Sequence, residues 1–191
     1  LDEECKQSLL EDIDELDMLV SDLLEAERLN SQHAGLNRDA IDVADFTKQI
    51  IEQHWQGNTQ LNFVCSKHIA APELFSLDKL RYKLLVRNLV SNALKYGESK
   101  PIEVKIHADL DKIILTISDN GLGIEKEHIE RISEPFYRAD NARQRQTGGF
   151  GLGLYLCRLI VEAHSGQFEI TSEIGQGTQA TVSLPVTTSK K

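Results

Sequence analysis

Lys112-Ile-Ile-Leu-Thr-Ile-Ser118, followed at once by Asp119-Asn-Gly-Leu-Gly123, is the stretch around which this chain is organised. The apolar run between polar residues predicts a buried strand. A carboxylate and two glycines follow the end of that strand. Glycine lets the backbone turn tightly or approach a ligand closely. Because Asp-Asn-Gly is also an ordinary turn sequence, these five residues alone leave a turn and a binding loop as open alternatives.

The first thirty residues predict one long amphipathic helix. Its apolar residues recur in alternating steps of four and three, as in a helical bundle, at Leu9, Ile13, Leu16, Val20 and Leu23. One helix cannot bury such a stripe alone, so we expect partner helices from outside this sequence or from a second copy. The polar segment 31–37 is the expected domain boundary. We therefore divide the chain into a partial bundle helix with its linker (1–37), a globular domain (38–187) and a tail (188–191).

The globular domain predicts mixed strands and helices. Asp45 is the expected N-cap of a helix that ends near Trp55, and Leu80 is among the expected inward positions of the second strong helix. The expected strands span 40–44, 61–66, 74–76, 102–108, 112–118, 167–172 and 178–185, and the expected helices span 45–55, 78–96, 125–132 and 154–164. This order predicts an α+β fold, a two-layer α/β sandwich with a mixed sheet covered on one face by helices, preceded by one long amphipathic helix.

Composition excludes several classes of function. The net charge of -9 argues against general nucleic-acid binding, which needs a basic face. No apolar run approaches the roughly 18 residues that a membrane-spanning helix needs. The three cysteines are far apart in sequence, which favours small buried apolar residues over metal ligands or disulfides.

Three further segments suggest a polyanion site. Asn88, Asn92 and Lys95 fall at i, i+4 and i+7, so they share one face of a predicted helix, and partial exposure of that face would satisfy their polar groups. The segment 133–149 lacks apolar periodicity and is either a functional lid or a disordered segment. Gly149-Phe-Gly-Leu-Gly153 leads directly into a helix, an arrangement that can present backbone N–H groups to phosphates.

Taken in order, these segments resemble two-component sensor histidine kinases. Asn88-Leu-Val-Ser-Asn-Ala-Leu-Lys-Tyr96 is similar to the N box, and Asp119 to Gly123 to the first glycine box. Glu134-Pro-Phe-Tyr-Arg138 resembles the F box, Gly149 to Gly153 the second glycine box, and Gly175-Gln-Gly-Thr178 the last glycine motif. The resemblance covers about residues 40–185 and implies the ATP-binding sandwich shared with type II topoisomerases and a heat-shock chaperone. It also implies that the first helix is the second helix of the dimerisation and phosphotransfer hairpin.

The resemblance implies roles for individual residues. Asp119 would accept the adenine amino hydrogen, and Gly121 and Gly123 would let the backbone approach the base. Asn88 would be an oxygen ligand of Mg²⁺, and Lys95 would neutralise phosphate charge, so these two are the expected catalytic residues. The remaining residues of the expected ATP site are Asn92, Tyr96, Ile124, Arg138, Gly149, Phe150, Gly151, Leu152, Gly153 and Thr178. For Arg138, a structural ion pair is an equal alternative to a phosphate contact.

The chain departs from the family pattern in three places. Ser133 stands where an aromatic residue is common, and Leu84 stands where related ATPases carry a glutamate that activates water. The absence of that glutamate fits phosphoryl transfer with little hydrolysis. None of the six histidines has the helical context of the family's phosphoacceptor, and each is interpreted as a surface or packing residue. We therefore expect a chain that binds ATP but does not phosphorylate itself by the family's route.

The resulting hypothesis is the ATP-binding catalytic core of a sensor histidine kinase. In the intact protein it would transfer the γ-phosphoryl of Mg-ATP to a histidine outside this fragment, and the phosphate would pass to the receiver domain of a response regulator. The resemblance also implies a homodimer and the cytoplasmic part of an inner-membrane sensor, with no nucleic acid bound. The alternatives are a nucleotide-sensing module, or an ATPase or serine kinase on the same fold.

Overall fold

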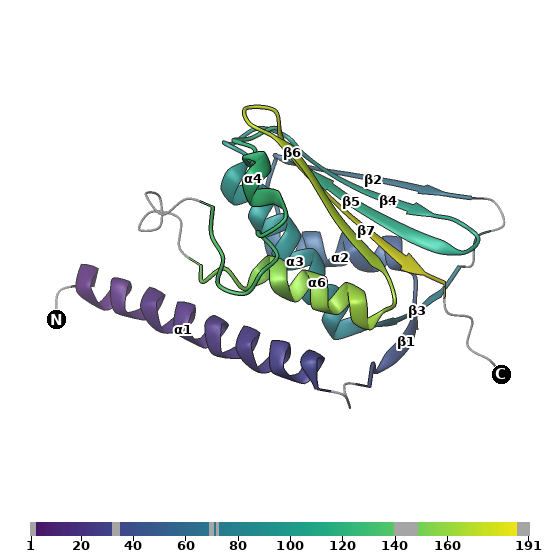
Figure 1. Ribbon diagram of the computed structural model, residues 1–191, viewed down its shortest axis with the longest axis horizontal. Coiled ribbons are helices and arrows are strands. Elements are labelled where there is room, and N and C mark those ends of the chain that lie inside the picture. The colour runs from purple at the N-terminus through teal and green to yellow at the C-terminus, as the bar shows by residue number, and fades with distance from the viewer. Residues whose placement is uncertain (1–2, 32–34, 69–70, 72, 140–148, 187–191) are drawn as a thin grey trace.

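The computed structural model describes residues 3–31, 35–68, 71, 73–139 and 149–186. A five-stranded sheet and a layer of helices form a two-layer sandwich, and the long helix α1 (Glu3–Asn30) lies on the side of the helices away from the sheet (Figure 1). The predicted α+β class and its long leading helix are thus confirmed. Residues 140–148, most of the expected lid, and the tail 188–191 lie outside the described residues.

The sheet has the order β2-β4-β5-β7-β6. Its strands are β2 (Leu61–Lys67), β4 (Ile102–Ala108), β5 (Lys112–Ser118), β6 (Gln167–Glu173) and β7 (Gly177–Pro185). The pair β2/β4 is parallel and the other pairs are antiparallel, so the sheet is mixed as predicted. Side chains alternate between the two faces of a strand, and in β4 the buried set is Ile102, Val104, Ile106 and Ala108.

Helices α2 (Val43–Trp55), α3 (Lys79–Tyr96) and α6 (Gly153–Ala163) cover the buried face of the sheet, and the short α4 (Lys126–Ile129) lies near β6. Apolar residues of α3 and α6 form one core with the inward residues of the strands. A small antiparallel pair, β1 (Arg38–Ile41) and β3 (Phe75–Asp78), precedes α3. The centre of the sandwich is therefore α3, which packs against helices and against both sheets.

Several local predictions are wrong. The N-cap of α2 is Asp42, whose carboxylate accepts hydrogen bonds from the backbone N–H groups of Ala44 and Asp45, so the expected cap Asp45 lies inside the first turn. Leu80 is 80% exposed because it lies on the face of α3 opposite the buried residues Tyr82, Leu85 and Leu89. Of the three cysteines only Cys157 is buried, whereas Cys5 and Cys65 are exposed. The helix expected over 125–132 is only the four-residue α4, and turns follow it.

The expected start of α3 at Asp78 is confirmed, and Asp78 is the N-cap of this helix. The Asp78 carboxylate accepts a hydrogen bond from the backbone N–H of Arg81 at 3.1 Å and another from that of Asn37 at 3.0 Å. Asp78 is 6% exposed, and the Arg81 guanidinium lies 3.9 Å from its carboxylate. The cap therefore also fixes the chain that enters β1.

The C-terminal part of α1 is docked on the sandwich. Ala26 is buried against Leu156 and Leu159 of α6. Nε of Arg81, on α3, lies 2.8 Å from the Glu25 carboxylate, and both side chains are mostly buried. The predicted apolar stripe is exposed along the rest of the helix, at 46–55% for Leu9, Ile13, Leu16, Val20 and Leu23. Among the described residues, no helix combines the length and apolar character that crossing a membrane requires.

Candidate functional site

The polar face of α3 opens into a cavity. Asn88 and Asn92 are partly buried and Lys95 is exposed, as a partly exposed face predicts. Nδ2 of Asn88 is buried and has no hydrogen-bond partner among the described residues, which is costly for an amide. A side chain at Gly153 would come within 3.0 Å of Oδ1 of Asn88, so the glycine keeps this amide clear.

Asp119 lies at the other end of the cavity, where β5 ends. It is 8% exposed, and its Oδ1 accepts hydrogen bonds from the backbone N–H groups of Gly121 at 2.9 Å and Thr178 at 3.3 Å. Burial raises the pKa of this carboxyl, and the two backbone donors oppose the rise. Both hydrogen bonds from the described residues fall on Oδ1. Oδ2 is therefore left for a donor that enters the cavity.

The glycines after Asp119 lie in close contact with the backbone of neighbouring elements. A side chain at Gly121 would meet the backbone carbonyl of Tyr96 at 1.9 Å, and one at Gly123 would meet that of Glu173 at 2.0 Å. Leu122 donates its backbone N–H to the same Tyr96 carbonyl at 3.1 Å. These glycines therefore press the turn against α3 and the β6–β7 connection. Gly123 lines the cavity and Gly121 is not among its lining residues, and the expectation that both let the backbone approach a base stays a prediction.

The second glycine loop forms the wall opposite α3. Gly149 and Gly151 have positive φ angles of 85° and 75°, a region in which other residues are strained. The backbone N–H of Phe136 donates to the Gly151 carbonyl at 3.0 Å, and Nη1 of Arg138 donates to the Gly149 carbonyl. Helix α6 then begins at Gly153 with no side-chain cap, so its first N–H groups are available to an anion.

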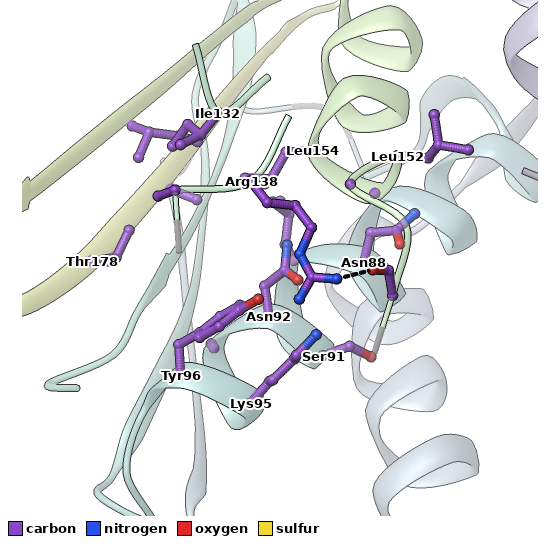
Figure 2. A pocket seen from close by; sticks show the side chains of 18 of the residues that line it. Asn88, Ser91, Asn92, Lys95, Tyr96, Ile132, Arg138, Leu152, Leu154 and Thr178 are labelled. Atoms are coloured by element: carbon purple, nitrogen blue, oxygen red, sulfur yellow. Dashed lines mark hydrogen bonds between the residues drawn. The ribbon is translucent and has the colours of Figure 1, made fainter. Parts of the chain in front are cut away.

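One cavity of about 1510 Å³ connects these parts. It is lined by all of the predicted ATP-site residues apart from Gly121, namely Asn88, Asn92, Lys95, Tyr96, Asp119, Gly123, Ile124, Arg138, Gly149, Phe150, Gly151, Leu152, Gly153 and Thr178. Figure 2 shows Asn88, Asn92, Lys95 and Tyr96 along α3, with the Arg138 side chain extending across the space above them. Segments that are far apart in sequence therefore meet around one space.

Sequence reasoning missed two groups of lining residues. Apolar residues close the end near Asp119, among them Ile117, Leu122, Ile132, Ile170 and Ala180. The alternation along β5 and β7 could have indicated Ile117 and Ala180, whereas Ile132 follows from no local pattern. The second group is Arg87 and Ser91 on α3, with Asp17, Met18, Leu19, Ser21 and Asp22 on α1. Nothing in the sequence places α1 beside the cavity.

The segment before Arg138 is anchored to α4. The Tyr137 hydroxyl lies 2.6 Å from Nδ1 of His128, and the Arg131 guanidinium lies 4.2 Å from the centre of the Tyr137 ring. Among the described residues, one group of three has metal-ligand atoms close together, at Glu125, Glu127 and His128. It consists largely of exposed acidic side chains, which are common without an ion. Asn88 fits Mg²⁺ better, because Mg²⁺ takes one or two protein oxygens alongside water and phosphate.

The fold and the cavity together define a nucleotide-binding α/β sandwich of the ATPase type. Residues 77–188 match the family of histidine kinase-, DNA gyrase B- and HSP90-like ATPases. Because this match covers more than half of the chain, the protein belongs to that family.

Curated relatives are sensor proteins of bacteria. The chain is 33% identical over 179 residues to the sensor protein kinase WalK of Staphylococcus haemolyticus, which covers 92% of this chain and 29% of that protein. It is 32% identical over 189 residues to the sensor protein SrrB of Staphylococcus aureus, covering 96% of this chain and 32% of that protein. The chain thus spans about a third of the length of these relatives.

Solved structures share the fold. The histidine kinase AdeS of Acinetobacter baumannii superposes with a TM-score of 0.78 at 21% identity, over 98% of this chain and 87% of that one. Full-length ShkA in complex with AMPPNP also gives a TM-score of 0.78, at 23% identity, over 97% of this chain and 39% of that one. These likenesses show that the chain shares the fold of the matched parts of both proteins.

Proposed function

We propose that this chain is the ATP-binding catalytic core of a sensor histidine kinase, which transfers the γ-phosphoryl of ATP to a histidine outside residues 1–191. The observation that carries the proposal is the single cavity with the Asp119 carboxylate at one end and Lys95, Asn88 and the Gly149–Gly153 loop at the other. A cavity with a carboxylate acceptor at the base end and N–H and ammonium donors at the phosphate end suits ATP.

The base end would select adenine. Oδ2 of Asp119 would accept the adenine amino hydrogen, while Oδ1 keeps its two backbone donors. The apolar residues around Ile117 would cover the ring, and Tyr96 and Thr178 would border it. A base with a carbonyl in place of the amino group would leave two acceptors facing each other, which is the basis of selectivity in a buried polar site.

The phosphate end would work by position and charge. Phosphate oxygens would be bound by the uncapped N–H groups at the start of α6 and by the Lys95 ammonium, with Asn92 beside them. Arg138 would release the Gly149 carbonyl and donate to a phosphate instead. Asn88 would hold Mg²⁺ through Oδ1. When bound, Mg²⁺ supplies neutralisation of the charge that develops during transfer. Leu84 offers no group that could activate water, which favours transfer over hydrolysis.

The family and the exposed stripe of α1 support a proposal for the setting of this core. Residues 1–37 would belong to a dimerisation hairpin, residues 38–187 would form the catalytic domain, and residues 188–191 would be its tail. The exposed apolar stripe of α1 would join a homodimer. We place the domain on the cytoplasmic side of an inner-membrane sensor, with the receiver domain of a response regulator as the next phosphate acceptor.

Transfer to a separate acceptor tests this function. The chain, Mg²⁺ and ATP labelled at the γ-phosphate are incubated with a separately produced phosphotransfer hairpin of a related kinase. Phosphate that is labile in acid and stable in base on the hairpin is the expected result. Release of inorganic phosphate alone, or phosphate that survives acid, would instead identify an ATPase or a serine kinase, and binding without either reaction would identify a nucleotide sensor.

A further inference from the structure

Ser172, a partly buried residue of β6, has a hydroxyl group with three hydrogen-bond partners among the described residues. The backbone N–H of Ile124 donates to its Oγ at 2.9 Å. The Gly177 carbonyl lies 2.8 Å from Oγ, and the Thr178 hydroxyl lies 2.9 Å from it. Ile124 follows the glycine turn that begins at Asp119, whereas Gly177 and Thr178 begin β7. One side chain therefore ties that turn to the start of β7.

The chemistry of the three partners assigns the hydrogens of this network. A serine hydroxyl has one hydrogen to donate and two lone pairs with which to accept. A carbonyl can only accept and a backbone N–H can only donate, so Ser172 donates to Gly177 and accepts from Ile124. The second lone pair remains for Thr178, whose hydroxyl must then be the donor of that hydrogen bond. The hydroxyl of Ser172 is therefore fully used within the chain.

Thr178 carries this assignment into the base end of the cavity. It lines the cavity from β7 (Figure 2), whereas Ser172 is not among the lining residues. Because its hydrogen is directed to Ser172, the Thr178 hydroxyl offers a ligand only the lone pairs of its oxygen. Thr178 is also joined to Asp119 by backbone hydrogen bonds in both directions, and its N–H lies 3.3 Å from Oδ1 of that carboxylate. The base end therefore presents two neighbouring acceptors.

We propose that Ser172 is a positioning residue that makes the base end of the cavity select a base with an amino group. An amino group carries two hydrogens, one for Asp119 and one for Thr178, whereas a carbonyl in its place would face two acceptors. Without the Ser172 hydroxyl, the Thr178 hydroxyl is free to turn and donate, and a carbonyl is tolerated. This inference rests on the proposed function, since it requires a nucleotide whose base lies toward Asp119.

A pair of nucleotides that share their ribose and diphosphate tests this role. ADP carries an amino group at position 6 of the purine, and inosine diphosphate (IDP) carries a carbonyl there. Their dissociation constants are measured by calorimetry with Mg²⁺ on the full chain. We expect the wild type to prefer ADP by about 100-fold, and Ser172→Ala to reduce this preference by about tenfold. Ser172→Thr keeps the hydroxyl and should restore the preference.

Ser183→Ala is the matched control. Ser183 stands between the buried residues Val182 and Leu184 of β7, so its side chain lies on the opposite face of the sheet from theirs. The same serine-to-alanine change at this position should leave both dissociation constants unchanged. Urea unfolding of each variant identifies any loss of stability separately from the change in base preference.

Thr178→Val tests the path of the effect, because valine has the shape of threonine without its hydroxyl. The preference for ADP should fall as in Ser172→Ala, and the double variant should show no further fall. An unchanged preference in Thr178→Val overturns the proposal, even if Ser172→Ala does not fold. Equal weakening of ADP and IDP binding by Ser172→Ala also overturns it, since that indicates a purely structural hydroxyl, and so does a wild type without preference. Wild-type protein that binds neither nucleotide would overturn the proposed function instead.

Discussion

Nε2 of His164 accepts a hydrogen bond from the backbone N–H of Asp78 at 3.1 Å, so the end of α6 is joined to the residue that caps α3. The other ring nitrogen, Nδ1, lies 2.7 Å from the Ile160 carbonyl. Nδ1 must donate to that carbonyl while Nε2 accepts, and the imidazole is therefore neutral. A histidine 86 residues away thus completes the start of the central helix.

The neutral state of His164 predicts a pH dependence of stability. Burial lowers the pKa of this imidazole, and Arg38 and Arg81 lower it further, while the Ile160 carbonyl and Asp78 act in the opposite direction. Because the unfolded chain takes up a proton more readily, the stabilising contribution is complete above about pH 6.5 and is lost as the pH falls through the lower folded pKa. Urea unfolding between pH 7.5 and pH 5 should show a decline that His164→Gln reduces. If the free energy of unfolding of the His164→Gln variant falls with pH as steeply as that of the wild type, His164 is not the source of the pH dependence.

Asp119→Asn should abolish adenine recognition without unfolding the protein. The new Oδ1 can still accept from Gly121 and Thr178, so its Nδ2 must take the place of Oδ2, and a donor would then face the adenine amino group. We expect ATP affinity to fall by about 100-fold or more in calorimetry. Asp111→Asn, on an exposed turn, is the control and should bind as the wild type does. Equal ATP affinity in the two variants would remove Asp119 from the base site.

Gly121→Ala should destabilise the fold through protein contacts alone. Its methyl group would overlap the Tyr96 carbonyl, and backbone on both sides leaves no flexible atom to move. We expect a loss of at least about 2 kcal/mol in the free energy of unfolding. Gly35→Ala, where no atom lies within 4 Å, should change stability by about 1 kcal/mol or less. Similar denaturation midpoints for the two variants would show that the turn can shift away from α3.

Asn88→Ala should weaken the Mg²⁺-dependent binding of ATP without a large effect on the stability of the fold. The variant loses the expected oxygen ligand, so the Mg²⁺ concentration that half-saturates ATP binding should rise by about tenfold. The substitution also removes a buried amide group that lacks a hydrogen-bond partner among the described residues. The free energy of unfolding should therefore fall only by the contribution of the lost packing contacts, with no further loss from a broken hydrogen bond. Asn62→Ala on the exposed edge strand is the control. A magnesium titration that matches this control would count against Asn88 as the ligand.

Local signals predicted most of the fold. The helix expected over 78–96 agrees with α3 to within one residue, because its capping residues Asp78 and Gly97 act through local interactions. The same rule failed at α2, where Asp42 and Asp45 are equally good caps by type and only the pairing of β1 with β3 decides between them. The apolar spacing placed Leu80 inward, although the buried face at this end of α3 is formed by Tyr82 and Leu85.

Contacts between distant segments were beyond local patterns. The order of the glycine motifs indicated one site. It did not show that the Tyr96 carbonyl leaves no room for a side chain at Gly121. The Glu25–Arg81 ion pair joins residues 56 positions apart, and a charged pair on two helices has no signature within either one. For that reason the sequence predicted the cavity's α3 and glycine walls and omitted its α1 wall.

The contacts of Arg138 with Gly149 and of Phe136 with Gly151 tie two separate stretches of the cavity wall directly to each other. In both contacts the acceptor is a backbone carbonyl of a glycine. The link therefore does not depend on which side chains the chain carries between the two stretches, and the cavity wall formed by residues 136–138 and 149–151 can be kept while the sequence between them changes.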